Sequence, residues 1–178
     1  MRVAVIADTH LRDRDRLAYP DGGHSRSSRQ RDLPAQAWER IAGADVILHA
    51  GDVLETGTLE RLNEIAPTYA VLGNNDLALT GLLPLTRVLD LAGVRVAMVH
   101  DAGARKGRPA RLRRRFPDAG IVVFGHSHAP CNEVGLDGQI LFNPGSPTTR
   151  RTQPTRTMGE FVLAEGRCVR RLIVDLGP

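Results

Sequence analysis

Short hydrophobic runs, rich in β-branched residues, recur along the chain, and each run ends in glycine or in polar residues. Such runs are typical of strands in a mostly buried sheet. The pattern predicts strands at residues 2–7, 45–50, 68–73, 86–91, 94–99, 121–125, 132–136, 139–143, 159–164 and 168–176. Helical patterns at 34–43 and 57–66 lie between the first three strands, whereas strands dominate the second half of the chain.

The order of these elements indicates an α/β fold in which one sheet packs on another and helices lie outside. Asp137 and Gly138 are residue types that form tight turns, so they predict one hairpin. A further short helix is expected within 104–120, with Pro109 near its first turn and Pro117 beyond its end.

A polar segment without clear periodicity spans residues 11–33. We expect a long exposed loop there, and a loop of this length is usually functional or disordered. No repeat and no linker divides the sequence, and 178 residues suit one domain. Residues 1–178 are therefore expected to form a single domain.

Composition narrows the classes of function. The net charge is +4, and nearly all the positive charge is arginine because Lys106 is the only lysine. This balance suits anionic substrates without selecting nucleic acid over small phosphates. Few aromatic residues accompany the arginines of 104–120, which argues against a stacking platform for single strands. No apolar run approaches the roughly 20 residues that span a bilayer, and no signal-peptide pattern opens the sequence. We therefore expect a cytoplasmic protein without a membrane partner.

Side chains that can bind metals follow five of the predicted strands. The first strand ends in Asp8 and His10, whose side chains lie on the same side of an extended segment. Later strands end in further carboxylate, amide and imidazole groups: Asp52, Asn74, His100, His126 and His128. One such histidine alone is more often structural than a ligand, but the repetition at successive strand ends indicates a metal centre.

These motifs resemble those of the calcineurin-like metallophosphoesterases. The shared motifs, in order, are Asp8-Thr9-His10, Gly51-Asp52, Gly73-Asn74-Asn75-Asp76, His100 and Gly125-His126-Ser127-His128. The compact length and the segment 142–147 are similar to the small bacterial and archaeal phosphodiesterase subgroup, which is related to a eukaryotic retromer scaffold subunit. The resemblance implies the metallo-dependent phosphatase fold, a two-sheet β-sandwich flanked by helices in four layers, α/β/β/α.

The resemblance also implies two divalent metal ions. One ion is expected to bind Asp8, His10, Asp52 and His128. The other is expected to bind Asp52, Asn74, His100 and His126. Asp52 would be shared, since a carboxylate has two oxygens. This mixed donor set suits Mn, Fe, Co, Ni or Zn better than Ca or Mg, and manganese is the first expectation by resemblance.

The expected reaction is hydrolysis of a phosphodiester, in which a hydroxide that bridges the metals attacks phosphorus. Asp52 is catalytic in this scheme through both ions. Asn75 stands where many family members carry a histidine that contacts the phosphate or protonates the leaving group. An amide can hydrogen-bond a phosphoryl oxygen but cannot act as a general acid. His24, in the 11–33 loop, is a candidate for the missing acid, and an exposed loop histidine is the alternative.

Two further residues are expected to support the ligands. Asp76 is predicted to orient a ligand histidine, with a role in forming a turn as the alternative. His49 is predicted to lie hydrogen-bonded beneath the metals, with a role as a ligand as the alternative.

Other functions fit the same motifs. A phosphomonoesterase or a nuclease would use the same site, and a protein-binding scaffold like the retromer subunit is a third reading. A small phosphodiester is the expected partner, whereas nothing specific in the sequence supports nucleic acid. The oligomeric state stays open, with a homo-oligomer as one option.

Overall fold

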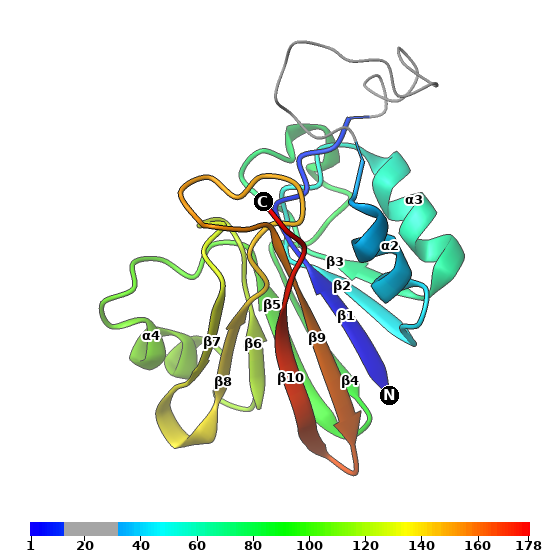
Figure 1. Ribbon diagram of the computed structural model, residues 1–178. Coiled ribbons are helices and arrows are strands. Elements are labelled where there is room, and N and C mark those ends of the chain that lie inside the picture. Colours follow the sequence, from blue (N-terminus) through cyan, green and yellow to red (C-terminus); the bar gives the residue numbers. More distant parts are fainter. Residues whose placement is uncertain (13–31) are drawn as a thin grey trace.

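Two five-stranded sheets face each other in the computed structural model of the protein (Figure 1). The structure describes residues 1–12 and 32–178, so most of the predicted 11–33 loop lies outside the described residues. The first sheet has the strand order β10 (Arg167–Asp175), β9 (Thr157–Ala164), β1 (Arg2–Ile6), β2 (Val46–His49) and β3 (Thr68–Ala70). The second has the order β4 (Thr86–Leu91), β5 (Val94–Val99), β6 (Ile121–Val123), β8 (Ile140–Asn143) and β7 (Cys131–Val134).

The direction of the strands brings their polar ends to the same edge of each sheet. β1, β2 and β3 are parallel to one another, and so are β5, β6 and β8. Parallel strands end at the same edge of their sheet, so the segments that follow them emerge together. A hydrogen bond of 3.2 Å from the His126 amide to Asp8 Oδ1 joins the edge of one sheet to the edge of the other.

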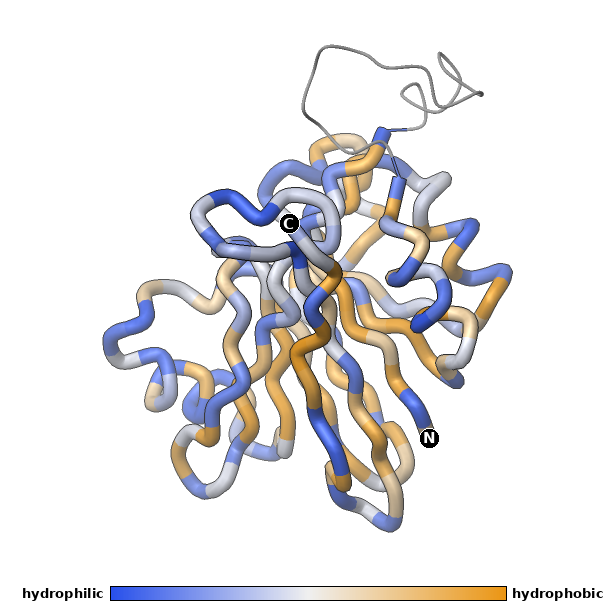
Figure 2. The backbone as a smooth tube through the Cα atoms, in the orientation of Figure 1, coloured by the Kyte–Doolittle hydropathy of each residue, from blue (hydrophilic) through white to orange (hydrophobic). Residues whose placement is uncertain are grey.

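Side chains of β1 alternate between two hydrophobic layers, as expected for a strand buried on both faces. Val3 and Val5 pack into the core between the sheets, whereas Ala4 and Ile6 pack beneath helices α2 (Ala35–Ile41) and α3 (Thr56–Ile65). Figure 2 shows the result as strands that are mainly hydrophobic and connecting loops that are mainly hydrophilic.

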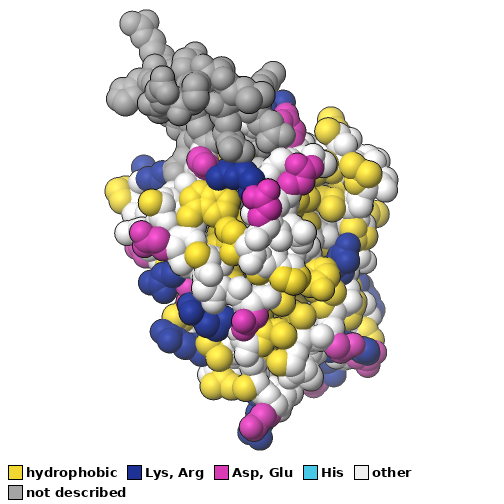
Figure 3. Space-filling model, turned by 90° about the vertical axis from the view of Figure 1, so that its right-hand side faces the viewer, with side chains coloured by type: hydrophobic (Ala, Val, Ile, Leu, Met, Phe, Trp, Pro, Cys, Tyr) yellow, Lys and Arg dark blue, Asp and Glu magenta, His cyan; other side chains and the backbone are white. Residues whose placement is uncertain are grey.

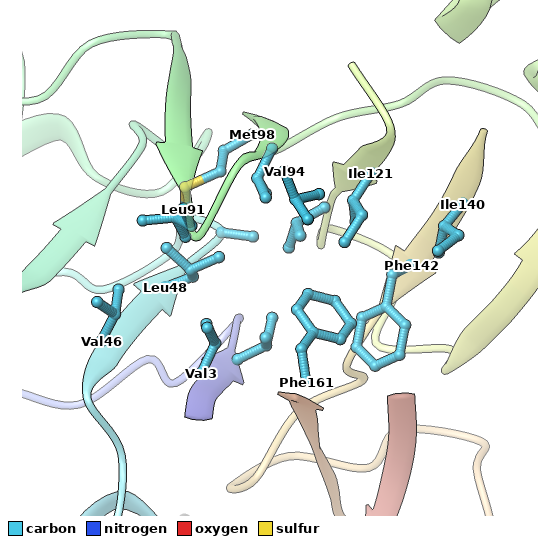
Figure 4. Packing of buried hydrophobic residues seen from close by; sticks show 14 of the residues in the cluster. Val3, Val46, Leu48, Leu91, Val94, Met98, Ile121, Ile140, Phe142 and Phe161 are labelled. Carbon is cyan, nitrogen blue, oxygen red and sulfur yellow. The ribbon is translucent and has the colours of Figure 1, made fainter. Parts of the chain in front are cut away.

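The core between the sheets is rich in large side chains (Figure 4). Phe142 of β8 and Phe161 of β9 meet edge to face there, with ring centroids 4.6 Å apart. On the outer face of the second sheet, Leu112 and Phe116 pack α4 (Arg108–Arg115) against β6. Helices thus cover the outer face of each sheet.

This architecture confirms the predicted four-layer fold. Each predicted strand overlaps an observed one, α2 and α4 lie within the segments predicted to be helical, and α3 begins one residue before its predicted segment. The predicted hairpin joins β7 to β8 through a 3₁₀ turn, η2 (Leu136–Gly138). Asp137 and Gly138 have φ values of 51° and 77°, as a tight hairpin turn requires. A second 3₁₀ turn, η1 (Leu77–Leu79), follows Asp76.

Candidate metal centre

Most of the predicted ligands lie on backbone that turns sharply as it leaves a strand. Positive φ values between 49° and 68° occur at Asp8, His10, Asp52, His126 and His128. Residues other than glycine rarely adopt this conformation, which costs on the order of 1 kcal/mol or more per residue. Such strain clusters at functional sites because the surrounding structure enforces it. The fold therefore holds these side chains in place at an energetic cost.

Two glycines allow the ligand segments to approach one another. A Cβ atom on Gly73 would lie 2.2 Å from both the amide nitrogen and Oδ1 of Asp52. A Cβ atom on Gly125 would lie 2.8 Å from Asp8 Oδ2. The glycines of these motifs are therefore needed for close contact between the segments.

The first ligand group contains Asp8, His10 and His128. The Nε2 atoms of the two histidines lie 3.3 Å apart, and His128 Nε2 lies 3.5 Å from Asp8 Oδ1. His128 Nδ1 donates to the Thr149 carbonyl, which fixes the proton there and leaves Nε2 with its lone pair in the neutral ring. Ligand atoms about 2.1 Å from a common ion lie roughly 3.0–3.4 Å apart at tetrahedral or octahedral angles. The spacing of this group fits a shared ion.

The second ligand group is centred on Asn74. Its Oδ1 atom lies 2.8 Å from His126 Nδ1 and 3.0 Å from His100 Nε2. His100 Nδ1 donates to the Ala50 carbonyl over 2.8 Å, so Nε2 is the free ligand atom of the neutral ring. This group also has the spacing of ligands around one ion.

Two carboxylates lie between the groups. Asp52 Oδ2 is 3.6 Å from His10 Nε2 and 3.5 Å from His100 Nε2, so Asp52 faces both groups. Ligand atoms of Asp8, Asp52 and His100 also lie within 4.8 Å of one another. Asp8 therefore reaches the second group as well, whereas the resemblance implied only one shared carboxylate.

The two carboxylates differ in their protonation. Burial and, to a smaller extent, the nearby Asp52 charge raise the pKa of Asp8 to about 7, although the neighbouring His100 opposes this shift in part. Burial alone would also raise the pKa of Asp52, but the neighbouring His100 and two hydrogen bonds from Asn75 hold that pKa below its ordinary value. Asp8 Oδ2 is buried and has no hydrogen-bond partner among the described residues. A buried acceptor without a partner is costly, and a cation beside it would satisfy it.

Two of the ligand histidines, His10 and His128, have the protonation that metal binding needs, and His100 differs from them. Burial lowers the pKa of His10, and it lowers the pKa of His128 to about 4, so both rings are neutral near pH 7. Burial also opposes the charge on His100, yet the carboxylates of Asp52 and Asp8 raise its pKa overall. Positive charge is thus favoured between Asp52 and His100, where the second ion is expected. The donor set and its charges fit two divalent ions.

Asp76 supports the site in a different way from the one predicted. Its carboxylate is buried and accepts the backbone amides of Asp52 at 2.9 Å, Leu54 at 2.7 Å and Gly73 at 2.7 Å. The prediction that it orients a ligand histidine is wrong, because the carboxylate is occupied by these amides, whereas the contacts with Gly73 agree with the alternative role in a turn. Asp76 fixes the backbone of two ligand segments instead.

His49 lies beneath the ligands, as predicted. Its Nε2 atom lies 3.0 Å from Thr9 Oγ1, and burial lowers its pKa to about 3, so the ring is neutral. It belongs to neither ligand group among the described residues.

The segment after β8 contributes contacts that sequence reasoning missed. Ser146 Oγ donates to the Asp8 carbonyl over 2.8 Å, and Thr148 Oγ1 donates to the Thr9 carbonyl over 2.7 Å. Arg151 Nη1 donates to the His126 carbonyl over 3.3 Å. The only signal in the sequence was the resemblance of residues 142–147 to the family, which says nothing of these partners.

The candidate acid His24 lies outside the described residues.

Within residues 1–12 and 32–178, no helix has both the length and the apolar character that a membrane crossing requires.

Comparisons with known proteins agree with this chemistry. Residues 1–166 match the calcineurin-like phosphoesterase superfamily domain. A probable metallophosphoesterase of Methanothermobacter thermautotrophicus is 30% identical over 172 residues, which cover 93% of this chain and 91% of that protein.

Two solved structures share the fold. Vps29 of Entamoeba histolytica, solved in complex with Zn²⁺, superimposes with a TM-score of 0.71 at 20% identity, over 99% of this chain and 100% of that one. A protein described as a novel archaeal phosphodiesterase gives a TM-score of 0.63 at 16% identity, over 98% and 100% of the two chains. At these identities the likeness shows the fold alone. The match over residues 1–166 shows that the chain belongs to the calcineurin-like phosphoesterase superfamily and is a metal-dependent phosphoesterase.

Proposed function

We propose that the protein is a phosphodiesterase that uses two divalent metal ions held by the residues described above. The observation that carries this proposal is the pair of ligand groups with Asp52 between them, 3.6 Å from His10 and 3.5 Å from His100. Such an arrangement supports a binuclear centre, because one carboxylate oxygen, Oδ2, lies near a histidine nitrogen from each group and could be shared by two ions.

Charge supports a phosphodiester anion as the substrate. Two divalent ions would bring four positive charges against two carboxylates, Asp8 and Asp52, while Asn74 and the neutral imidazoles add none. The bound ions would lower the pKa of a water and offset the charge that develops on the phosphoryl oxygens. The positive surplus in a largely buried site would attract a phosphodiester and stabilise its transition state.

Asn75 bears on the choice of substrate. Its amide cannot protonate a leaving group, so the proposed activity should favour diesters whose leaving groups depart without a proton. We therefore expect hydrolysis rates to fall steeply as the pKa of the leaving group rises. A series of aryl phosphodiesters measures this slope, and a flat dependence would point to a general acid elsewhere in the chain.

The direct test is hydrolysis of bis(p-nitrophenyl) phosphate by metal-stripped protein after Mn, Ni, Co, Zn or Mg is added in turn. We expect activity to return with a transition metal, Mn first, and Asp52→Asn to lower it by at least about 100-fold. Asp101→Asn is the matched control, since that exposed carboxylate accepts only the Gly103 amide among the described residues. No activity with any metal in a protein that binds ions would contradict the proposal.

Two alternative functions, a phosphomonoesterase and a nuclease that would use the same site, remain predictions. Acidic and basic side chains are interspersed on the face that carries α2 and α3, so that face has no continuous basic stripe for a nucleic acid (Figure 3). Rates on aryl phosphate monoesters and diesters separate the first reading from the proposal, and salt-dependent DNA binding tests the second. The likeness to Vps29 supports a protein-binding scaffold only through the shared fold.

A further inference from the structure

An exposed arginine stands beside the ligand groups without being part of them. Arg151 follows β8 in the segment that leads to β9, and its backbone has a φ of 51°. Its Nη1 atom donates to the carbonyl of His126 over 3.3 Å. Burial dominates the pKa shifts of Asp8, His10 and His128, and the nearby guanidinium charge makes a smaller contribution that lowers each of these pKa values. A permanent positive charge therefore sits at the edge of the candidate metal centre.

The segment that carries Arg151 is fixed to the ligands on both sides. Thr148 Oγ1 donates to the Thr9 carbonyl, inside the motif that supplies Asp8 and His10. The Thr149 carbonyl accepts the Nδ1 proton of His128. Only one residue separates this carbonyl from Arg151, so the backbone of Arg151 is fixed relative to the ligand side chains. The bond to the His126 carbonyl positions its guanidinium.

We propose that Arg151 binds the non-bridging oxygens of the substrate phosphoryl group. The inference rests on the proposed function and names a specificity-determining residue for it. A guanidinium has five N–H donors in a planar fork that matches phosphate oxygens, and one of them is used on the His126 carbonyl. Arg151 is exposed as a residue, next to a site built to attract an anion. A phosphodiester in the site would be bound by Arg151 as well as by the metal centre.

Arg150 provides a matched control. It is the neighbouring residue, it is exposed, and its Nη1 atom donates to the Gln153 carbonyl over 3.0 Å. Arg150→Gln and Arg151→Gln change the net charge of the protein equally, so a general loss of positive charge would affect both variants alike. Arg151→Lys keeps the charge but loses the fork, and it should give an intermediate effect.

The experiment measures inorganic phosphate binding and diester hydrolysis by the metal-loaded protein and its variants. Calorimetry gives the Kd of phosphate, steady-state rates give kcat and KM for bis(p-nitrophenyl) phosphate, and elemental analysis gives the metal content. We expect Arg151→Gln to weaken phosphate binding and raise KM by about 10-fold to 100-fold, with the metal content unchanged. Arg150→Gln should stay within about twofold of the unsubstituted protein.

Three results would overturn the inference: unchanged phosphate affinity in Arg151→Gln, equal losses in Arg150→Gln and Arg151→Gln, or loss of bound metal in Arg151→Gln alone. The last would show that Arg151 merely holds the His126 carbonyl. Failure of the proposed function is distinguishable, because a protein that hydrolyses no diester can still be titrated with phosphate. Absence of phosphate binding in the unsubstituted metal-loaded protein would also overturn the inference.

Discussion

Both carboxylate oxygens of Asp52 accept hydrogen bonds from Asn75. The backbone amide donates to Oδ1 over 2.8 Å, and the side-chain amide donates to Oδ2 over 2.7 Å. Asn75 thus fixes the rotation of the carboxylate that lies between the two ligand groups. In this conformation its side chain supports Asp52, and the predicted contact with a phosphoryl oxygen stays a prediction.

Asn75→Ala tests this support. The backbone bond to Oδ1 remains, but the side-chain bond is lost, so the Asp52 carboxylate is free to rotate. We expect metal affinity and kcat/KM to fall by about 10-fold or more, as is usual when a residue that orients a metal ligand is removed. Asn132→Ala is the control, because the side-chain oxygen of Asn132 accepts an exposed hydrogen bond from Arg171 instead. Full metal affinity in Asn75→Ala would show that the second bond is dispensable.

Asp76→Asn is expected to destabilise the fold. The substituted side chain would place an N–H donor against the backbone amides that the carboxylate now accepts, from Asp52, Leu54 and Gly73. Leaving buried amides unpaired should lower the free energy of unfolding by about 2–4 kcal/mol. Urea unfolding of the metal-free protein measures the change. Asp175→Asn, at an exposed carboxylate that accepts the Gly177 amide, should cost less than about 1 kcal/mol, and equal costs would refute the argument.

The fold was largely predictable because hydrophobic alternation and turn residues are local signals. The hydrophobic run at residues 2–7 predicted the buried strand β1, and Asp137 with Gly138 predicted the hairpin between β7 and β8. The pairing of strands was harder to predict from the sequence. β9 comes far later in the chain yet lies directly beside β1, and no local pattern specifies that neighbour.

The candidate site was also predictable from the sequence only in part. Strand ends and motif spacing brought the predicted ligands together, since parallel strands end at one edge. The partners of Asp76 could not be predicted, because a carboxylate that binds backbone amides leaves no mark on the identity of those residues. Arg151 was missed for a related reason: it is one of many arginines, and only the folded chain places it beside His126.

Gly73→Ala should disrupt both stability and metal binding. The added Cβ atom would lie 2.2 Å from the amide nitrogen of Asp52, and backbone on both sides must move to admit it. We expect a loss of about 3 kcal/mol or more in the free energy of unfolding, together with weaker metal binding. At Gly120 the nearest atom to an added Cβ is 3.8 Å away, so Gly120→Ala should be nearly neutral. Comparable effects at the two glycines, in denaturant unfolding and metal titration, would argue against the close approach.

Asp8 should make the metal-free protein less stable at higher pH. Its pKa is raised by burial to about 7 in the folded chain from an ordinary value of 3.8, so the folded state holds a proton that the unfolded state has lost. This stabilisation is complete below about pH 4 and is lost as pH rises through about 7.

Asp8→Asn isolates that effect, because the amide imitates the protonated acid. Compared with the unsubstituted protein in chelator, the variant should be about equally stable at pH 4 and more stable at pH 8, by on the order of 2–4 kcal/mol. Urea unfolding at both pH values measures the difference. A difference that does not change with pH would mean that Asp8 ionises normally.

The number of Mn²⁺ ions bound per chain tests the central claim most directly. Calorimetric titration of metal-stripped protein, checked by elemental analysis, should saturate at two ions, and Asp52→Asn should lose at least one of them because Asp52 faces both ligand groups. Saturation at a single ion, or two ions bound with full affinity by Asp52→Asn, would contradict a binuclear centre built around Asp52.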